Sequence, residues 1–415
     1  MTFSAGTPAS ASGNGHPGAE RPRWWIYRGT GEPLHDTTLA ELLPQAPPWR
    51  RFTGAPALPS PPPDEEETVR RLGARPPARA LSEFARREAE MVNAALLLRR
   101  PLLVIGRPGT GKSSLAYRVS RELRLGRVLR WHISSRTTLQ RGLYEYDAIG
   151  RVQDSAALRA AATGADAWTT PAATPPAATD GAAADGAADR AADAVRDPGS
   201  APALPPDVGD YIQLGPLGTA LLPYDEPRVL LVDELDKSDL DLANDLLSVF
   251  EEGSYPVPEL LRARRRHPSV TVLTDDPSGE AEIVGGRVTC RAFPFVVMTS
   301  NSEREFPPAF LRRCLVLRMP EPDEQDLAHM LAAHFDEETA ERFGGPLIAK
   351  FLARSREQGG LSIDQLLNSL YIATSYGAEE HNGDLLELAE RVWHRLDGSV
   401  VQPGTAGGAG RGSDG

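Results

Sequence analysis

A glycine-rich run carries residue types that suit the binding of a phosphate. Gly106-Arg107-Pro108-Gly109-Thr110-Gly111-Lys112-Ser113 fits the pattern G-x-x-x-x-G-K-[ST], whose glycines let backbone N–H groups curl around a phosphate without a Cβ in the way. We predict an apolar strand, Leu102–Ile105, before the run and a helix, Lys112–Leu125, after it. A helix N-terminus adds partial positive charge. The sequence therefore predicts a phosphate-binding loop that extends to Ser114.

Two side chains of this loop have the chemistry to act on a nucleoside triphosphate. Lys112 would reach the β- and γ-phosphates and assist catalysis, and the Ser113 hydroxyl would ligate Mg²⁺. Lysine occurs only at positions 112, 237 and 350, because almost all basic residues are arginine. A chance lysine at this position of a glycine-rich turn is therefore a poor explanation.

An acidic pair, Asp233-Glu234, follows a second apolar strand, Val229–Val232. In parallel sheets, ligands bind at the carboxyl ends of the strands. We expect Asp233 to hold the water shell of Mg²⁺ and Glu234 to polarise the water that attacks the γ-phosphate. The alternative is a turn that only leads into the next helix.

Two further polar features could complete a hydrolytic site. Asn301 follows the predicted strand Phe295–Thr299, and its amide could hold the attacking water, or it could merely satisfy a turn. Arg312 and Arg313 precede a short predicted strand, Leu315–Leu317. An arginine that reaches a neighbouring subunit's γ-phosphate accelerates hydrolysis about 10³–10⁵-fold, whereas in a lone subunit the pair would be a solvated surface.

Composition narrows the class of protein. The 415 residues carry a formal charge of −12, which gives the chain no electrostatic reason to seek nucleic acid. Only two cysteines occur, Cys290 and Cys314, which argues against a disulfide framework and fits a cytoplasmic protein. The N-terminus lacks the pattern of a signal peptide. The most apolar stretch, Ala94–Ile105, is too short to span a bilayer.

The predicted helices, strands and loops divide the chain into five regions. We expect a disordered tail over 1–20, an aromatic and proline-rich segment over 21–78, an α/β core over 79–320, a helical domain over 321–400 and a disordered tail over 401–415. Strands that alternate with helices predict a mostly parallel sheet flanked by helices. The run of about 156–206 is poor in large apolar side chains and should be a disordered insertion.

Three local expectations follow from residue patterns. Aromatic residues of the N-terminal segment should pack on the core, and Pro59–Glu67 should be a linker. Val270–Leu273 and Ile283–Thr289 should form a hairpin. The aromatic residues in question are Trp24, Trp25, Tyr27, Trp49 and Phe52.

Taken together, these motifs resemble an AAA+ ATPase with a C-terminal helical lid, and within that group the MoxR branch. The resemblance covers roughly Ser82 to Leu396. Its more specific marks are Leu214-Gly215-Pro216-Leu217, the hairpin-like segment Val270–Arg291, and the insertion after Tyr144. The Trp24–Arg28 preface and the string Arg141–Ala148 are similar to MoxR-like ATPases that accompany von Willebrand factor A domain proteins.

The resemblance implies a ring, usually hexameric, with ATP and Mg²⁺ at the subunit interfaces. It implies that Lys112, Ser113, Asp233, Glu234 and Asn301 serve the site in cis and that Arg312 or Arg313 completes it in trans. A chaperone-like role on a protein partner also follows, with a von Willebrand factor A domain protein as a candidate. Where the family often carries a lid arginine, this chain has none over Leu361–Leu366.

Three alternatives stay open beside the protein remodeller. A motor subunit acting on nucleic acid would use the basic run Arg262–His267, although such a run is more often solvated. A metal-chelatase motor subunit is a related ring ATPase. An ATP-binding scaffold with little turnover would keep the loop and lose the hydrolysis.

Overall fold

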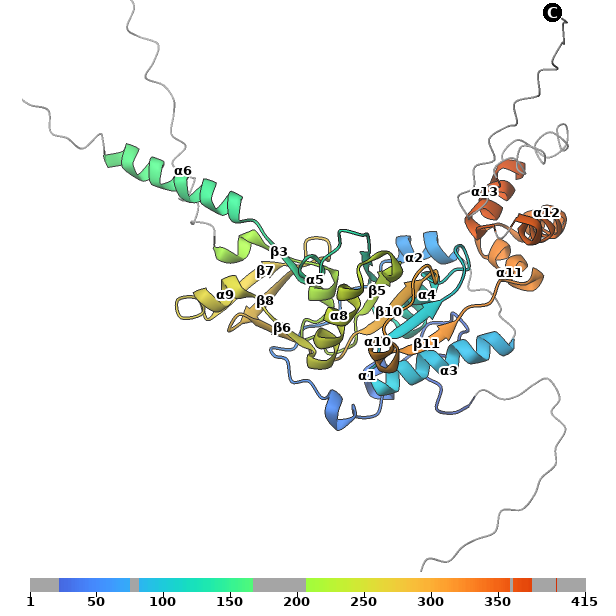
Figure 1. The fold of residues 1–415 in the computed structure, drawn as a ribbon, viewed down its shortest axis with the longest axis horizontal. Coiled ribbons are helices and arrows are strands. Elements are labelled where there is room, and N and C mark those ends of the chain that lie inside the picture. Colours follow the sequence, from blue (N-terminus) through green and yellow to red (C-terminus); the bar gives the residue numbers. More distant parts are fainter. Residues whose placement is uncertain (1–21, 75–81, 167–206, 359–360, 375–392, 394–415) are drawn as a thin grey trace, which may run out of the picture.

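The computed structural model describes residues 22–74, 82–166, 207–358, 361–374 and 393 (Figure 1). Its centre is a five-stranded, all-parallel sheet in the order β11-β1-β10-β5-β2, which confirms the predicted parallel α/β core. The strands are β1 (Leu102–Ile105), β2 (Leu129–His132), β5 (Val229–Asp233), β10 (Phe295–Ser300) and β11 (Leu315–Arg318). The predicted strands lie within two residues of these bounds.

Alternate residues of these strands feed two apolar clusters, one on each face of the sheet. Leu103 and Leu230 belong to one cluster, Leu102 and Leu231 to the other. Helices add side chains to both clusters: α3 and α4 on one face, and α5, α7, α8 and α10 on the other. Their bounds are Glu83–Leu98 (α3), Ser114–Leu123 (α4), Leu139–Leu143 (α5), Pro216–Ala220 (α7), Leu240–Glu252 (α8) and Pro308–Arg313 (α10).

A second sheet, in the order β3-β4-β7-β8, extends from the core beside a two-stranded sheet of β6 and β9. The new strands are β3 (Tyr144–Tyr146), β4 (Ile212–Leu214), β6 (Ser254–Pro256), β7 (Ser269–Leu273), β8 (Glu280–Val284) and β9 (Arg287–Thr289). Short helices η2 (Val208–Tyr211) and α9 (Pro258–Ala263) precede β4 and β7, and η3 (Leu235–Lys237) follows β5 of the core sheet.

The predicted hairpin forms between β7 and β8, but its second arm is shorter than expected. The arm breaks at Gly285 and Gly286, which both have positive φ, and β9 then pairs with β6 instead. A Cβ on Gly286 would lie 2.5 Å from the backbone N of Leu261, so no side chain fits there. The predicted strand Ile283–Thr289 is therefore wrong as one continuous arm.

The disordered insertion predicted over about 156–206 is wrong at its start. Helix α6 (Ala148–Asp166) runs eleven residues into the stretch expected to be disordered from Ala156. Alanine has the highest helix propensity, so an alanine-rich run can continue a helix although it offers little to a core. Figure 1 shows α6 projecting from the body of the molecule. The remainder of the predicted insertion, 167–206, lies outside the described residues.

The N-terminal segment packs on the core through some of its aromatic residues. Trp25 and Tyr27 are buried, as predicted, whereas Trp24 and Trp49 are 50% and 74% exposed, so the prediction is wrong for these two tryptophans. Only one member of the adjacent Trp24–Trp25 pair is buried, and Trp49 lies in the short helix η1 (Pro48–Arg50) after α1 (Leu39–Leu42). Phe52 stacks on Phe293.

The predicted linker over Pro59–Glu67 ends early, because its acidic residues begin a helix. Helix α2 (Glu65–Leu72) is capped by Asp64, whose carboxylate accepts the Glu67 N–H. Acidic residues in the first turn of a helix are favoured by its dipole. Helix α2 then packs against α4.

Three helices follow the last core strand: α11 (Glu324–His334), α12 (Glu337–Gln358) and α13 (Ile363–Thr374). They share their own apolar cluster, which includes Leu331, Phe351, Leu366 and Trp393. The helical C-terminal region is therefore as predicted over the described residues. Most of residues 375–400 of that predicted region and both predicted tails lie outside them. No helix of the described part combines the length and the apolar character needed to cross a bilayer.

Candidate nucleotide site

The glycine-rich run forms the turn between β1 and α4, as the motif requires. Gly109 and Gly111 have φ values of +74° and +77°, which side chains rarely adopt. A Cβ on Gly109 would also lie 2.6 Å from the Cα of Ser362, because the C-terminal helical region packs against the loop. Helix α4 begins at Ser114, two residues later than predicted.

Lys112 is almost fully buried at the base of the loop. Its Nζ donates to the carbonyl oxygens of Gly106 (2.9 Å) and Arg107 (2.7 Å) and to Oδ1 of Asn301 (2.7 Å). Burial lowers the pKa of the ammonium group, while the nearby carboxylates oppose the shift. Strand β10 lies next to β1 in the sheet, so Asn301, one residue beyond β10, reaches the loop.

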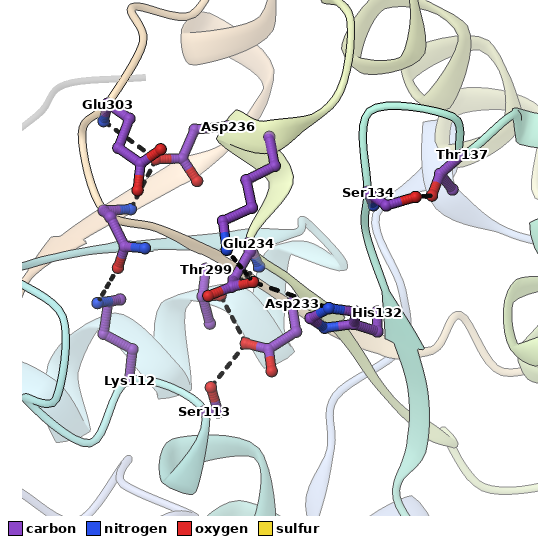
Figure 2. A network of polar contacts seen from close by, with 12 residues as sticks. Lys112, Ser113, His132, Ser134, Thr137, Asp233, Glu234, Asp236, Thr299 and Glu303 are labelled. Atoms are coloured by element: carbon purple, nitrogen blue, oxygen red, sulfur yellow. Dashed lines mark hydrogen bonds and ion pairs between the residues drawn. The ribbon is translucent and has the colours of Figure 1, made fainter. Parts of the chain in front are cut away.

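Ser113 and Asp233 meet at the same edge of the sheet. The Ser113 hydroxyl donates to Oδ1 of Asp233 (2.6 Å; Figure 2). Arg130 lies 3.2 Å from Oδ2 of the same carboxylate. Burial would raise the pKa of Asp233, but hydrogen bonds from Ser113 and Thr299 and the charge of Arg130 outweigh it and hold this pKa below its usual value. A hydroxyl beside an ionised carboxylate suits Mg²⁺, which prefers oxygen ligands. The residues present therefore fit that ion.

Glu234 directly follows β5 and adopts a left-handed backbone conformation, with φ of 63°. Its N–H donates to Oγ1 of Thr299 (2.8 Å), and that hydroxyl donates to Oδ1 of Asp233 (2.8 Å). Its carboxylate accepts a hydrogen bond from Lys237 Nζ (2.7 Å) and lies 3.9 Å from Nε2 of His132. With this left-handed conformation between them, the carboxylates of Asp233 and Glu234 contact different partners.

A cavity of about 460 Å³ is lined by Lys112, Ser113, Asp233, Glu234 and Asn301. The C-terminal helical region forms one wall with Met330, His334 and Ile363, among others. The N-terminal segment forms another wall with Gly29–Gly31 and with Arg71 and Leu72 of α2. The cavity volume lies within the range of about 300–1,000 Å³ that small-molecule sites occupy, so a nucleotide can be accommodated there.

Glu122 of α4 holds the Gly29–Gly31 wall in place. This buried carboxylate accepts the N–H groups of Arg28 (2.5 Å), Gly29 (3.1 Å) and Gly31 (2.9 Å). Burial raises the pKa of Glu122, and the backbone N–H groups partly oppose the rise. The N-terminal segment is thus bonded directly to the helix that follows the phosphate loop.

The structure does not bring Arg312 and Arg313 to this site. Strand β11 runs parallel to β1, with Leu315 opposite Leu102, so residues that precede β11 lie at the amino edge of the sheet. The phosphate loop lies at the carboxyl edge. Arg313 pairs with Glu251, whereas the exposed Arg312 has no ion pair with any residue that the structure describes.

Sequence reasoning missed several residues of the site. Thr299, His132 and Lys237 contact the acidic pair, and Gly29–Gly31 line the cavity. His132 ends β2 as Asp233 ends β5, and only the strand bounds of the structure show this parallel. No sequence signal pointed to the Gly29–Gly31 wall, because the hydrogen bonds that hold it to Glu122 join segments about ninety residues apart.

The AAA domain (dynein-related subfamily) family model matches residues 101–314. The match spans more than half of the chain, from the start of β1 to the start of β11, and the chain belongs to this family. Its phosphate loop and family membership together define a nucleotide-binding AAA+ protein.

Two solved structures are similar to the chain at low identity. A variant of RuvB from Thermotoga maritima aligns with 11% identity and a TM-score of 0.34 over 75% of this chain and 68% of that one. NtrX from Brucella abortus in complex with ADP aligns with 13% identity and a TM-score of 0.38, over 78% of this chain and 58% of that one. No curated protein matches the chain.

Proposed function

We propose that the chain binds ATP with Mg²⁺ in this cavity and hydrolyses it. The observation that carries the proposal is the convergence of Lys112, the Ser113–Asp233 pair and Asn301 on the lining of the cavity. These groups come from three neighbouring strand ends, and each has the chemistry that a triphosphate requires.

Each of these residues has a definite role in the proposed reaction. Lys112 would exchange its carbonyl and amide partners for phosphate oxygens, and Ser113 and Asp233 would hold Mg²⁺, which supplies positive charge that offsets the charge of the triphosphate. Glu234 would accept a proton from the attacking water. Asn301, freed from Lys112, would orient that water.

The proposal extends to an assembly in which neighbouring subunits complete each other's sites. Arg312 has no ion pair among the described residues and stands at the edge of the sheet opposite its own loop. A second copy could place this guanidinium on the γ-phosphate of its neighbour. We further propose a ring of such subunits, as the MoxR resemblance suggests, that remodels a protein partner. A von Willebrand factor A domain protein is the first candidate.

A motor acting on nucleic acid is the second candidate function, because Arg264, Arg265 and Arg266 are exposed between α9 and β7. DNA binding that falls steeply with salt would favour it, since phosphate contacts release counterions. Absence of DNA binding at low salt would remove it.

The decisive test separates binding from turnover. Glu234→Gln should bind ATP with Mg²⁺ in calorimetry with near wild-type affinity and lose hydrolysis by about 100-fold or more. Lys112→Ala should lose both. Glu252→Gln, an exposed glutamate at the end of α8, is the matched control and should keep both.

If the wild-type chain hydrolyses ATP no faster than Glu234→Gln, the proposed ATPase is wrong. The chain would then be an ATP-dependent scaffold. If neither variant nor wild type takes up ATP, the site assignment itself is wrong.

A further inference from the structure

Asp236 is a buried carboxylate for which the proposed ATPase mechanism has no role so far. It lies in η3, two residues after Glu234, and is only 3% exposed. Its Oδ2 accepts the backbone N–H groups of Asn301 (2.8 Å) and Glu303 (3.1 Å). Its Oδ1 is buried and has no hydrogen-bond partner among the described residues.

A carboxylate in this state costs folding energy. Burial of a charge with incomplete hydrogen bonding is unfavourable, because the protein does not fully replace the hydration that the carboxylate loses. A neutral side chain could accept the same two N–H groups at lower cost. The position of Asp236 therefore calls for an explanation beyond closing a loop.

The loop that Asp236 binds carries Asn301, and this residue explains the position of Asp236. Asp236 fixes the backbone of Asn301, and the side chain of that same residue accepts from Lys112 Nζ (2.7 Å). One continuous set of hydrogen bonds thus runs from the acidic segment after β5, through the end of β10, to the lysine of the phosphate loop (Figure 2).

Asp236 also faces the charge of Lys112. Its carboxylate favours the protonated lysine, as do Asp233 and Glu234, against the effect of burial. Arg304 makes a further link by donating to the carbonyl of Ser238 (2.8 Å), so the loop after β10 is bonded to the segment after β5 at two places. The two segments therefore form one rigid unit around Asn301.

We infer that Asp236 is a positioning residue for hydrolysis: by its hydrogen bonds to the Asn301 and Glu303 N–H groups it fixes the Asn301 amide over the phosphate loop. The inference rests on the proposed ATPase. It predicts that Asp236 acts on turnover and leaves nucleotide binding to the loop itself. A misplacement of about 1 Å at such a group can cost about 100-fold in rate.

The test compares Asp236→Ala, Asp236→Asn and wild type. Alanine removes the acceptor, whereas asparagine keeps an oxygen for both N–H groups. We expect kcat to fall about 100-fold in Asp236→Ala and to return to within about tenfold of wild type in Asp236→Asn, with the ATP Kd from calorimetry within about threefold throughout. Asp239→Ala is the control, because Asp239 is exposed in the same segment and makes no capping bond.

Amide hydrogen exchange of the free protein gives a second readout that needs no turnover. The Asn301 and Glu303 amides should exchange at least about tenfold faster in Asp236→Ala than in wild type, and asparagine should restore their protection. A structural role alone would leave kcat unchanged in chains that remain folded by thermal unfolding.

Four results would overturn the inference. They are wild-type kcat in Asp236→Ala, an equal loss in both variants, a loss of ATP binding in a folded Asp236→Ala chain, and unchanged exchange of the two amides. A wild-type chain without turnover would overturn the ATPase proposal as well. The two failures are thus distinguishable.

Discussion

Thr299 holds both acidic residues of the site with a single hydroxyl group. Its Oγ1 donates to the Asp233 carboxylate and accepts the Glu234 N–H, and the side chain is 1% exposed. One hydroxyl can fill both functions because it is a donor and an acceptor at once. The orientation of the metal-binding acid and of the proposed base therefore depends on a neighbouring strand.

Replacement of Thr299 by valine keeps the shape of the side chain and removes the hydroxyl. We expect Thr299→Val to lower the free energy of unfolding by about 1–3 kcal/mol, because it leaves a buried N–H without a partner. The Mg²⁺ concentration for half-maximal ATPase should rise, because Asp233 loses a fixed donor. Urea unfolding and a Mg²⁺ titration measure the two effects. Thr271→Val, on an exposed position of β7, should change neither.

The site residues that belong to short sequence motifs could be predicted from the sequence. The loop residues and Asp233-Glu234 follow from short patterns, and Asn301 from its place after a strand. Thr299, Asp236 and Lys237 could not be found in this way. Thr299 and Asp236 act through contacts between β5 and β10, which are more than sixty residues apart in the chain, and only the strand order makes them neighbours.

At the scale of elements, the bond between α4 and the N-terminal segment shapes the cavity. The Glu122 carboxylate gathers three N–H groups of the segment, and Asn93 of α3 bonds the backbone of Ile26 and Tyr27 next to them. Two core helices thus position a wall that lies outside residues 101–314.

We expect Glu122→Ala to release this wall. Three partly buried N–H groups would lose their acceptor, and we predict a loss of about 3 kcal/mol in the free energy of unfolding. The Kd for ATP should rise about tenfold, because the wall must be ordered again when nucleotide binds. Denaturant unfolding and calorimetry check both. Glu90→Ala, an exposed glutamate on α3, is the control; equal effects in both variants would contradict the role of Glu122.

Element predictions succeeded where apolar strands alternate with helices and failed where glycine or alanine decides locally. The central strands β1, β5 and β10 were located because each is a buried apolar run. The second hairpin arm was wrong because Gly285 and Gly286 break it, and the start of the insertion was wrong because α6 continues through alanine. Composition predicts whether a core can form, and backbone propensity decides where a helix ends.

At the scale of the whole molecule, the proposed catalytic groups lie at opposite edges of one sheet. Lys112 lies at the carboxyl edge and Arg312 at the amino edge, because β11 and β1 are parallel and adjacent. If Arg312 acts on a neighbour, then a chain that lacks Lys112 can still supply an arginine, and a chain that lacks Arg312 can still bind ATP.

Mixing variants tests this arrangement directly. Lys112→Ala and Arg312→Ala should each be inactive alone, with a loss of about 10³-fold in kcat for the arginine variant. Mixed in equal amounts, they should regain a measurable part of the wild-type rate. Arg313→Ala is the comparison and should be milder, because Arg313 is paired with Glu251. If a mixture of Lys112→Ala and Arg312→Ala regains no ATPase activity, whereas a mixture of Lys112→Ala and Arg313→Ala does, then Arg313 is the residue that acts on the neighbour.

The side-by-side register of β1 and β11 has a consequence for how the protein responds to its own abundance. If no chain can complete its own reaction centre, the specific activity must grow with the number of encounters between copies. A sufficiently dilute preparation would then bind ATP without hydrolysing it. The strand order alone would thus make the activity per chain depend on the concentration of the protein.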